Sequence, residues 1–192
     1  MLPTLARSIG LFDRGQDLLP GGVSSPGRAF AEVETPPIFL ESGEGCHVVD
    51  ADGNRYMDFI GGLGPLILGH RPPAVQRALE AQLARGTVFA TPNALEYALA
   101  ERILASTPPL ERLRFACSGT EAAMTALRIA KAVTGRPKVL KFSGGYHGHA
   151  DTLLARGAKP HMRGRGCRVH DGLDDAVVQN TIVVSYNDVG GV

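Results

Sequence analysis

The stretch Phe115–Ala123 holds the residues best suited to chemistry, because an apolar run leads through Ser118, Gly119 and Thr120 into the start of an expected helix. The first turn of a helix leaves N–H groups unpaired and carries partial positive charge. Gly119 lets an anion approach the backbone closely, and the hydroxyl groups of Ser118 and Thr120 add hydrogen-bond donors. The pattern therefore predicts a phosphate-binding turn.

A second glycine-rich turn, Gly144–His149, follows the next expected strand and carries Tyr146 and His147. The glycines around Tyr146 favour an exposed ring that could stack on a flat ligand. The alternative is that Tyr146 is an ordinary surface or core aromatic. Together, the two turns predict a phosphorylated aromatic cofactor.

Two of these features also have simpler interpretations. Ser118 and Glu121 fit a capping box, in which the serine only caps the helix. The two interpretations are compatible, since a capped helix still offers its other N–H groups. Arg28 lies in a Ser/Pro/Gly-rich loop and could bind a carboxylate through its planar guanidinium group. Taken alone, the loop favours a solvated arginine.

Several histidines and one cysteine raise the question of zinc. His147 and His149 form a pair, and His161, Cys167 and His170 follow downstream. Their spacing matches no standard zinc site, so the sequence predicts no metal.

Composition narrows the class of protein. The chain has 192 residues, 44% hydrophobic and 20% charged, which suits one globular domain of ordinary size. The net charge of +1 gives no electrostatic reason to expect a nucleic-acid or anionic-membrane partner. The 3 cysteines are widely spaced and indicate free thiols. With no signal peptide and no spanning apolar stretch, we expect a cytoplasmic protein.

The first third of the chain reads as a helix followed by a hairpin. A helix is predicted over residues 5–19 and ends at Pro20-Gly21-Gly22. The charged run Glu41–Glu44 is predicted to be a solvated loop, and Asp52-Gly53-Asn54 to be a hairpin turn. Gly61–Pro65 is predicted to be a flexible joint near a subdomain boundary. The strands predicted in this part are 38–40, 46–50 and 55–59.

The remainder alternates between helices and short apolar strands. Such alternation predicts an α/β fold with a buried, largely parallel sheet. Ligands in these sheets bind beyond the carboxyl ends of the strands, where residues 118–120, 144–147 and 186–188 would converge. The predicted helices are 73–85, 93–105 and 120–133, and the predicted strands are 113–117, 139–142 and 181–185.

These motifs, in this order, carry a resemblance to a known family. The chain resembles the N-terminal part of the class III (fold type I) pyridoxal-phosphate aminotransferases, and within them the glutamate-1-semialdehyde 2,1-aminomutase branch. The resemblance implies a truncated fold type I architecture: a mostly parallel sheet with flanking helices, plus a small N-terminal helix and hairpin segment. Residues 1–64 would form that segment, and residues 65–192 an incomplete cofactor-binding domain. The matching stretches are 19–30, 45–58, 64–70, 114–122, 141–151 and 186–188.

The resemblance also implies roles for single residues. Ser118–Thr120 match the residues that hold the phosphate of pyridoxal 5'-phosphate, and Tyr146 matches the ring stacked on the cofactor, with His147 beside it. Ser25 and Arg28 match residues near the substrate, so the arginine is expected to bind the substrate carboxylate.

The implied reaction moves an amino group between adjacent carbons of glutamate 1-semialdehyde, a small amino-acid-like substrate, and gives 5-aminolevulinate for tetrapyrrole synthesis. The complete enzyme is expected to be a homodimer. Leu63 replaces an aromatic residue usual in that branch, and residues 158–179 depart from the family pattern. Both departures favour the alternative of another class III aminotransferase, which transfers an amino group from a donor to a keto acid.

A third possibility is a non-catalytic truncated product. The family's reaction needs a lysine that forms a Schiff base with the cofactor. The chain has only four lysines, Lys131, Lys138, Lys141 and Lys159, and none lies in a matching context. The sequence therefore predicts that this chain contains no catalytic lysine and that these four are surface residues.

Overall fold

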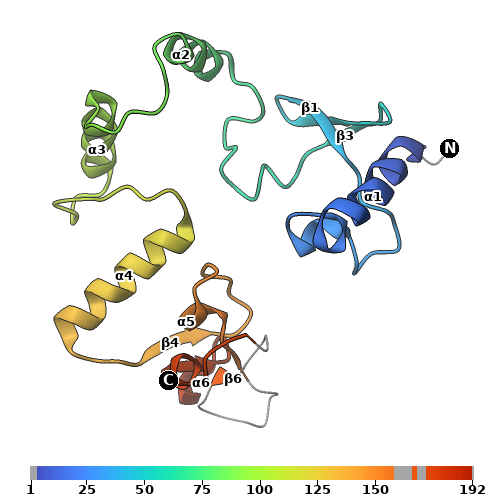
Figure 1. Cartoon of the computed structure of the whole chain (residues 1–192). Helices are drawn as coiled ribbons and strands as arrows, with labels where there is room; N and C mark the ends of the chain where they lie inside the picture. Colours follow the sequence, from blue (N-terminus) through green and yellow to red (C-terminus); the bar gives the residue numbers. More distant parts are fainter. Residues whose placement is uncertain (1–3, 158–165, 168–171, 192) are drawn as a thin grey trace. The chain divides into compact units, whose positions relative to one another are not determined.

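The computed structural model describes residues 4–157, 166–167 and 172–191 (Figure 1). The contacts within the chain divide it into two compact units. The first unit is Met1–Asn93 and the second is Ala94–Val192. These units are defined by contacts in space. The functional boundary between residues 64 and 65 is a different division, and it stays a prediction.

The first unit begins with helix α1 (Ala6–Leu18), which confirms the helix predicted over 5–19. The chain then turns through two short 3-10 helices, η1 (Pro20–Gly22) and η2 (Pro26–Ala29). Helix α1 ends at Leu18, just before Pro20-Gly21-Gly22 as predicted, and Leu19 already has extended backbone angles. Gly21 has a φ of 71°, a conformation that favours glycine and lets η1 turn the chain.

A three-stranded antiparallel sheet follows, with strands β1 (Leu40–Glu44), β2 (His47–Asp50) and β3 (Arg55–Met57) in that order. The predicted hairpin between β2 and β3 is confirmed. The prediction of a loop at Glu41–Glu44 is wrong, since this run belongs to β1 and pairs with β2. Its side chains are mostly exposed. A charged run can therefore be well solvated while its backbone completes a sheet.

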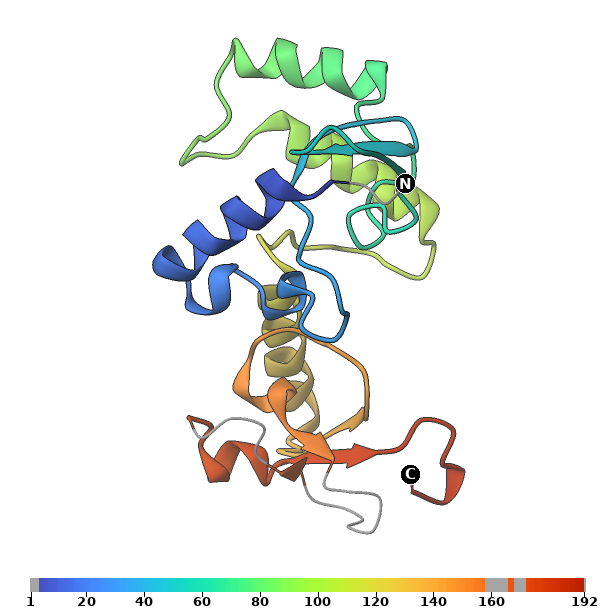
Figure 2. The ribbon, with the colours of Figure 1, turned by 90° about the vertical axis from the view of Figure 1, so that its right-hand side faces the viewer.

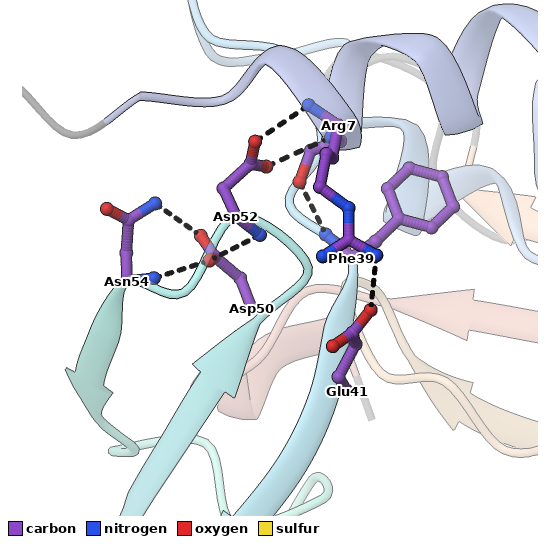
Figure 3. A network of polar contacts seen from close by, with 7 residues as sticks. Arg7, Phe39, Glu41, Asp50, Asp52 and Asn54 are labelled. Atoms are coloured by element: carbon purple, nitrogen blue, oxygen red, sulfur yellow. Dashed lines mark hydrogen bonds and ion pairs between the residues drawn. The ribbon is translucent and has the colours of Figure 1, made fainter.

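Helix α1 has no cap of its own, and Asp52 of the hairpin turn supplies one (Figure 3). The N–H groups of Arg7 and Ser8 donate to the two carboxylate oxygens of Asp52 at 2.7 and 3.0 Å. Ser8 is fully buried, and its Oγ accepts from the N–H of Phe39. The hairpin turn and Phe39, the residue just before β1, thus both hold the start of α1.

Asp50 organises the hairpin turn from inside (Figure 3). Its carboxylate accepts the N–H groups of Asp52 and Asn54, and also the side chains of Asn54 and Tyr56. Burial by itself would raise the pKa of Asp50, but the hydrogen bonds from Asn54 and Tyr56 outweigh it and lower the pKa below 3.8. Asp52 follows the same rule: burial opposes the shift, while hydrogen bonds from Ser8 and Arg7 lower its pKa.

A contact between Asp58 and His70 joins the two ends of the glycine-rich segment that follows β3. His70 Nε2 and Asp58 Oδ2 lie 2.7 Å apart, and His70 also exchanges two backbone hydrogen bonds with Gly45. The hydrogen bond from His70 lowers the pKa of Asp58. The predicted joint is therefore a loop with fixed ends. Leu63 at its tip is 91% exposed and has a φ of 69°.

Helix α2 (Pro73–Leu83) ends the regular structure of the first unit, and α3 (Ala94–Ser106) begins the second. Both helices were predicted from their hydrophobic periodicity and are confirmed. Neither contains a buried residue. No helix in the described part of the chain is long and apolar enough to cross a bilayer.

The second unit continues with the long helix α4 and a small parallel sheet. Strands β4 and β7 lie side by side, with Val139 paired to Thr181 and Phe142 paired to Val184 (Figure 2). Both strands and α4 were predicted and are confirmed. The remaining elements are α4 (Gly119–Thr134), β4 (Val139–Phe142), α5 (Asp151–Leu154), β5 (Arg156–Gly157), β6 (Gly166–Cys167), α6 (Asp175–Val178), β7 (Thr181–Val184) and η3 (Val189–Gly191).

The chain is α/β, but the prediction of a mostly parallel sheet is wrong in extent. Only β4 and β7 pair in parallel among the described strands, while β1–β3 and the β5–β6 pair are antiparallel. Residues 113–117, predicted as a strand, join no described ladder. An apolar run needs a neighbouring strand to supply hydrogen bonds before it becomes part of a sheet.

The described core of the second unit is small and includes one residue of β7. Ala155, Leu173, Val178 and Val183 are buried together, with Leu154 packed against them. The prediction that the lysines are surface residues is wrong for Lys141. This residue is buried in β4, and its Nζ donates to the carbonyl oxygen of Leu153 at 2.6 Å. Lys159 lies outside the described residues.

Acid should loosen the junction between α1 and the hairpin. The pKa values of Asp50 and Asp52 are lowered by folding, so their contribution to stability is present above their ordinary value of 3.8. It is lost as the pH falls through the lower folded values. The Asp52→Asn variant keeps a capping oxygen but has no charge to titrate. Its helical circular dichroism should therefore change less than that of the wild type between about pH 5 and pH 2.

Asp13→Asn is the matched control, since Asp13 is exposed on the same helix and has no polar partner among the described residues. This variant should keep the acid profile of the wild type. An Asp52→Asn profile that superimposes on the wild type would contradict the role given to Asp52.

Candidate cofactor site

The start of α4 is built as a capping box. Ser118 has extended backbone angles, and its Oγ accepts the N–H of Glu121 at 3.2 Å. Glu121 reaches back, and its Oε2 accepts the N–H of Cys117 at 2.8 Å. The capping interpretation of this motif is therefore confirmed. The Ser118 hydroxyl proton takes no part in these bonds and stays available to a ligand.

The capping box leaves room for an anion. Within the described residues, the N–H groups of Gly119 and Thr120 have no acceptor. A Cβ built on Gly119 meets nothing within 4 Å, so open space lies in front of this backbone. Two free N–H groups, two hydroxyl groups and the positive end of a 16-residue helix fit the charge and shape of a phosphate group.

The second glycine-rich turn contacts this helix start directly. The N–H of His149 donates to Thr120 Oγ1 at 3.0 Å. Gly148 is buried, and a Cβ added to it would lie 2.9 Å from both Cα and Oγ1 of Thr120. The structure thus brings together two of the three segments predicted to converge, and only glycine allows so close an approach.

Tyr146 and His147 project from this turn. Tyr146 is 77% exposed, so it is not part of the core. His147 is also exposed, and its ring lies against Gly145, where an added Cβ would be 2.7 Å from Nε2. The ring of Tyr146 is therefore accessible, and its stacking on a flat ligand stays a prediction.

The third segment, Tyr186–Asp188, follows β7 and stands beside the end of β4. The rings of Tyr186 and Phe142 meet edge to face, with centroids 5.7 Å apart. Sequence reasoning missed this pair, although Phe142 ends β4 and Tyr186 follows β7 by two residues, and both strands were predicted for one largely parallel sheet. The contact places the third segment next to the strand that leads into the Gly144–His149 turn.

Ser25 and Arg28 belong to the first unit and are described there by themselves. Both are exposed, and the N–H of Arg28 donates to the carbonyl oxygen of Ser25 at 2.9 Å across η2. A cleft opens beside them along the same loop. Its lining residues are Pro26, Gly27, Phe30, Ala31, Glu32 and Val33.

The residues considered for zinc are only partly described. His161 and His170 lie outside the described residues, and only the backbone of Cys167 is described. Within the described part, no three His, Cys, Asp or Glu side chains are grouped closely enough to hold a metal ion.

Comparison with known proteins decides the family. The sequence model of the family described as "Aminotransferase class-III" matches residues 29–188. The chain belongs to the class III aminotransferase family. The glutamate-1-semialdehyde 2,1-aminomutase of Rhodopirellula baltica is 46% identical over 185 residues, which are 96% of this chain and 42% of that protein. This class III chain therefore spans less than half the length of the curated relatives that it matches.

Solved structures agree with this class III assignment. An omega-transaminase from Sphaerobacter thermophilus matches with a TM-score of 0.87 and 34% identity, over 98% of this chain and 44% of that one. A glutamate-1-semialdehyde aminomutase from Pseudomonas aeruginosa PAO1, in complex with PMP, matches with a TM-score of 0.80 and 26% identity, over 97% and 40%. The family and its ligand-bound members indicate pyridoxal phosphate as the cofactor.

Replacing Gly148 with alanine should destabilise the second unit. The new methyl group would press on the Thr120 backbone, and a φ of 108° strains any residue with a side chain. We expect a loss of about 2 kcal/mol in the free energy of unfolding, measured by urea denaturation.

Gly144→Ala is the matched control. Gly144 also has a positive φ, of 80°, but an added Cβ meets nothing within 4 Å. This variant isolates backbone strain and should cost less than Gly148→Ala. Equal losses from the two variants would show that the close approach to Thr120 contributes nothing.

Proposed function

We propose that this chain holds the cofactor of a pyridoxal-phosphate-dependent enzyme that transfers amino groups. One observation carries the proposal. The start of α4 offers the free N–H groups of Gly119 and Thr120, and it contacts the turn that presents Tyr146. A phosphate subsite and an exposed aromatic ring therefore belong to one continuous structure, as a phosphorylated aromatic ligand requires.

Each residue has a distinct part in this site. The N–H groups of Gly119 and Thr120 and the hydroxyl of Ser118 bind phosphate oxygens, while the helix dipole favours the negative charge. Tyr146 covers one face of the aromatic ring, and His147 flanks it. When bound, pyridoxal phosphate supplies an electron sink for reactions at the amino-bearing carbon.

Ser25 and Arg28 are proposed to contact the substrate. The guanidinium group of Arg28 is exposed and forms no ion pair with a described residue, so it is available to a carboxylate. Its planar fork can give two parallel hydrogen bonds to such a group. This assignment suits a small amino-acid-like substrate.

For the complete enzyme, we propose the isomerisation of glutamate 1-semialdehyde to 5-aminolevulinate, carried out by a homodimer. Support comes from the curated aminomutases, which reach 46 to 47% identity over almost the whole chain. These alignments cover 96% of the chain, which includes the proposed substrate loop of the first unit.

The second candidate is conventional transamination by another class III enzyme. The omega-transaminase resembles this chain in structure more closely than the aminomutase does, with TM-scores of 0.87 and 0.80. Leu63 also favours this candidate, because it places an aliphatic side chain where the aminomutase branch usually has an aromatic one.

A third candidate is a chain that binds the cofactor without reacting. Lys131 lies within α4, and Lys138 is exposed just before β4. Lys141 is buried and bonded to the Leu153 carbonyl oxygen. None of these three lysines has the setting of a proton-transfer base, so the chain would hold the phosphate and the ring only.

The phosphate subsite is tested by Gly119→Ala. The added methyl group meets nothing within 4 Å, so the stability of the fold should be kept, while the methyl group narrows the space that a phosphate would occupy beside this backbone. Affinity for both pyridoxal 5'-phosphate and inorganic phosphate should fall about tenfold or more, as expected when hydrogen bonds to a charged group are lost. Calorimetric titration measures both affinities.

Gly172→Ala is the control for this experiment, since its added Cβ also meets nothing within 4 Å but lies on a different segment. It should leave both affinities unchanged. If Gly119→Ala bound phosphate as tightly as the wild type, the phosphate subsite could not lie at the start of α4.

The reaction is tested with the gene product that contains this sequence. Supplied with glutamate 1-semialdehyde, it should form 5-aminolevulinate, and Arg28→Lys should raise KM because the two-pronged contact is lost. Rapid transamination between an amino donor and a keto acid, without isomerisation, would reject the aminomutase in favour of the second candidate. Cofactor binding with neither activity would favour the third.

A further inference from the structure

Thr120 contacts the Gly144–His149 turn with both its backbone and its side chain. Its Oγ1 accepts the N–H of His149 at 3.0 Å, and its Cα lies where a side chain on Gly148 would have to go. Gly148 is buried at this contact, although the residues on either side of it are exposed. The turn therefore contacts Thr120 through Gly148 and His149, while its other residues are exposed to solvent.

The hydroxyl group of Thr120 has a donor to spare. A threonine hydroxyl has one O–H and two acceptor lone pairs, and the His149 contact uses only a lone pair. The O–H is free to donate to an anion at the start of α4, beside the N–H groups of Gly119 and Thr120. An anion that accepts a hydrogen bond from this O–H polarises the hydroxyl and makes its oxygen a better acceptor for the His149 N–H.

We propose that Thr120 is a positioning residue that couples the phosphate subsite to the ring-binding turn. Its hydroxyl donates a hydrogen bond to a phosphate oxygen and accepts one from the His149 N–H. Phosphate binding thereby tightens the turn that carries Tyr146. This inference rests on the proposed function, because it takes pyridoxal phosphate as the ligand.

The alternative roles of Thr120 give different signatures. If Thr120 served only as a phosphate donor, its loss would weaken inorganic phosphate and pyridoxal 5'-phosphate equally, since both carry the same group. If it served only to stabilise the fold, binding by the folded protein would not change. A positioning residue affects the ligand that has a ring more than the ligand that lacks one.

The first test needs no ligand. Hydrogen exchange is measured by mass spectrometry on peptides covering residues 144–149 in the 192-residue chain. Thr120→Val keeps the shape of the side chain but removes the acceptor, so exchange of the His149 amide should become about fivefold faster. Thr120→Ser keeps the hydroxyl and should retain the slow exchange. Unchanged exchange in Thr120→Val would overturn the contact on which the proposal depends.

The second test measures affinity for pyridoxal 5'-phosphate and for inorganic phosphate in the same variants. In Thr120→Val, the loss for pyridoxal 5'-phosphate should exceed the loss for phosphate by about fivefold, the equivalent of one net hydrogen bond. Thr120→Ser should restore both affinities to within about twofold of the wild type. Equal losses for the two ligands would overturn the positioning role and leave the proposed function standing.

A double-mutant cycle with Tyr146→Leu makes the coupling explicit. Tyr146→Leu should weaken pyridoxal 5'-phosphate binding in the wild type and have little further effect in Thr120→Val, because the ring is already displaced. Strictly additive losses would overturn the coupling. If the wild type bound neither ligand, the proposed function and the coupling would both fail, and the exchange experiment would still decide whether Thr120 seats the turn.

Discussion

The candidate site depends on one close approach, that of Gly148 and His149 to Thr120 at the start of α4. Without it, the helix terminus would be an ordinary anion site, and Tyr146 would be an exposed ring on an unrelated loop. The approach is possible because position 148 has no side chain and adopts a φ of 108°. A single backbone constraint therefore turns two weak sequence signals into one site.

The two long helices at issue, α1 and α4, solve the same problem in opposite ways. Each must satisfy the N–H groups of its first turn. In α1, a carboxylate from a distant turn accepts two of them, and the helix start becomes part of the folded framework. In α4, the capping box satisfies Glu121 and Cys117 but leaves Gly119 and Thr120 open. The unsatisfied end is the one suited to a ligand, because a ligand can bind only where the fold has not already supplied an acceptor.

Local patterns in the sequence predicted the elements well and their partners poorly. Periodicity and caps located α1, α2, α3 and α4, since those signals depend on residues within one helix. Residues 113–117 were predicted as a strand because they are apolar, but strand formation needs a neighbour that periodicity does not identify. The loop prediction for Glu41–Glu44 failed for the converse reason. The run is polar, but its backbone pairs with β2. In the site, the glycines and hydroxyls were predictable, whereas the Phe142–Tyr186 pair depends on the register between β4 and β7.

Sequence identity and structural similarity favour different activities for the complete enzyme. High identity to aminomutases reflects many positions together, including the hairpin and substrate loop of the first unit. The higher TM-score of a transaminase reflects the backbone, which the two activities share. Because phosphate and ring binding serve any reaction of this cofactor, Ser118, Gly119, Thr120 and Tyr146 cannot separate the two activities. The distinction must lie in residues that touch the rest of the substrate, which is the role proposed for Arg28.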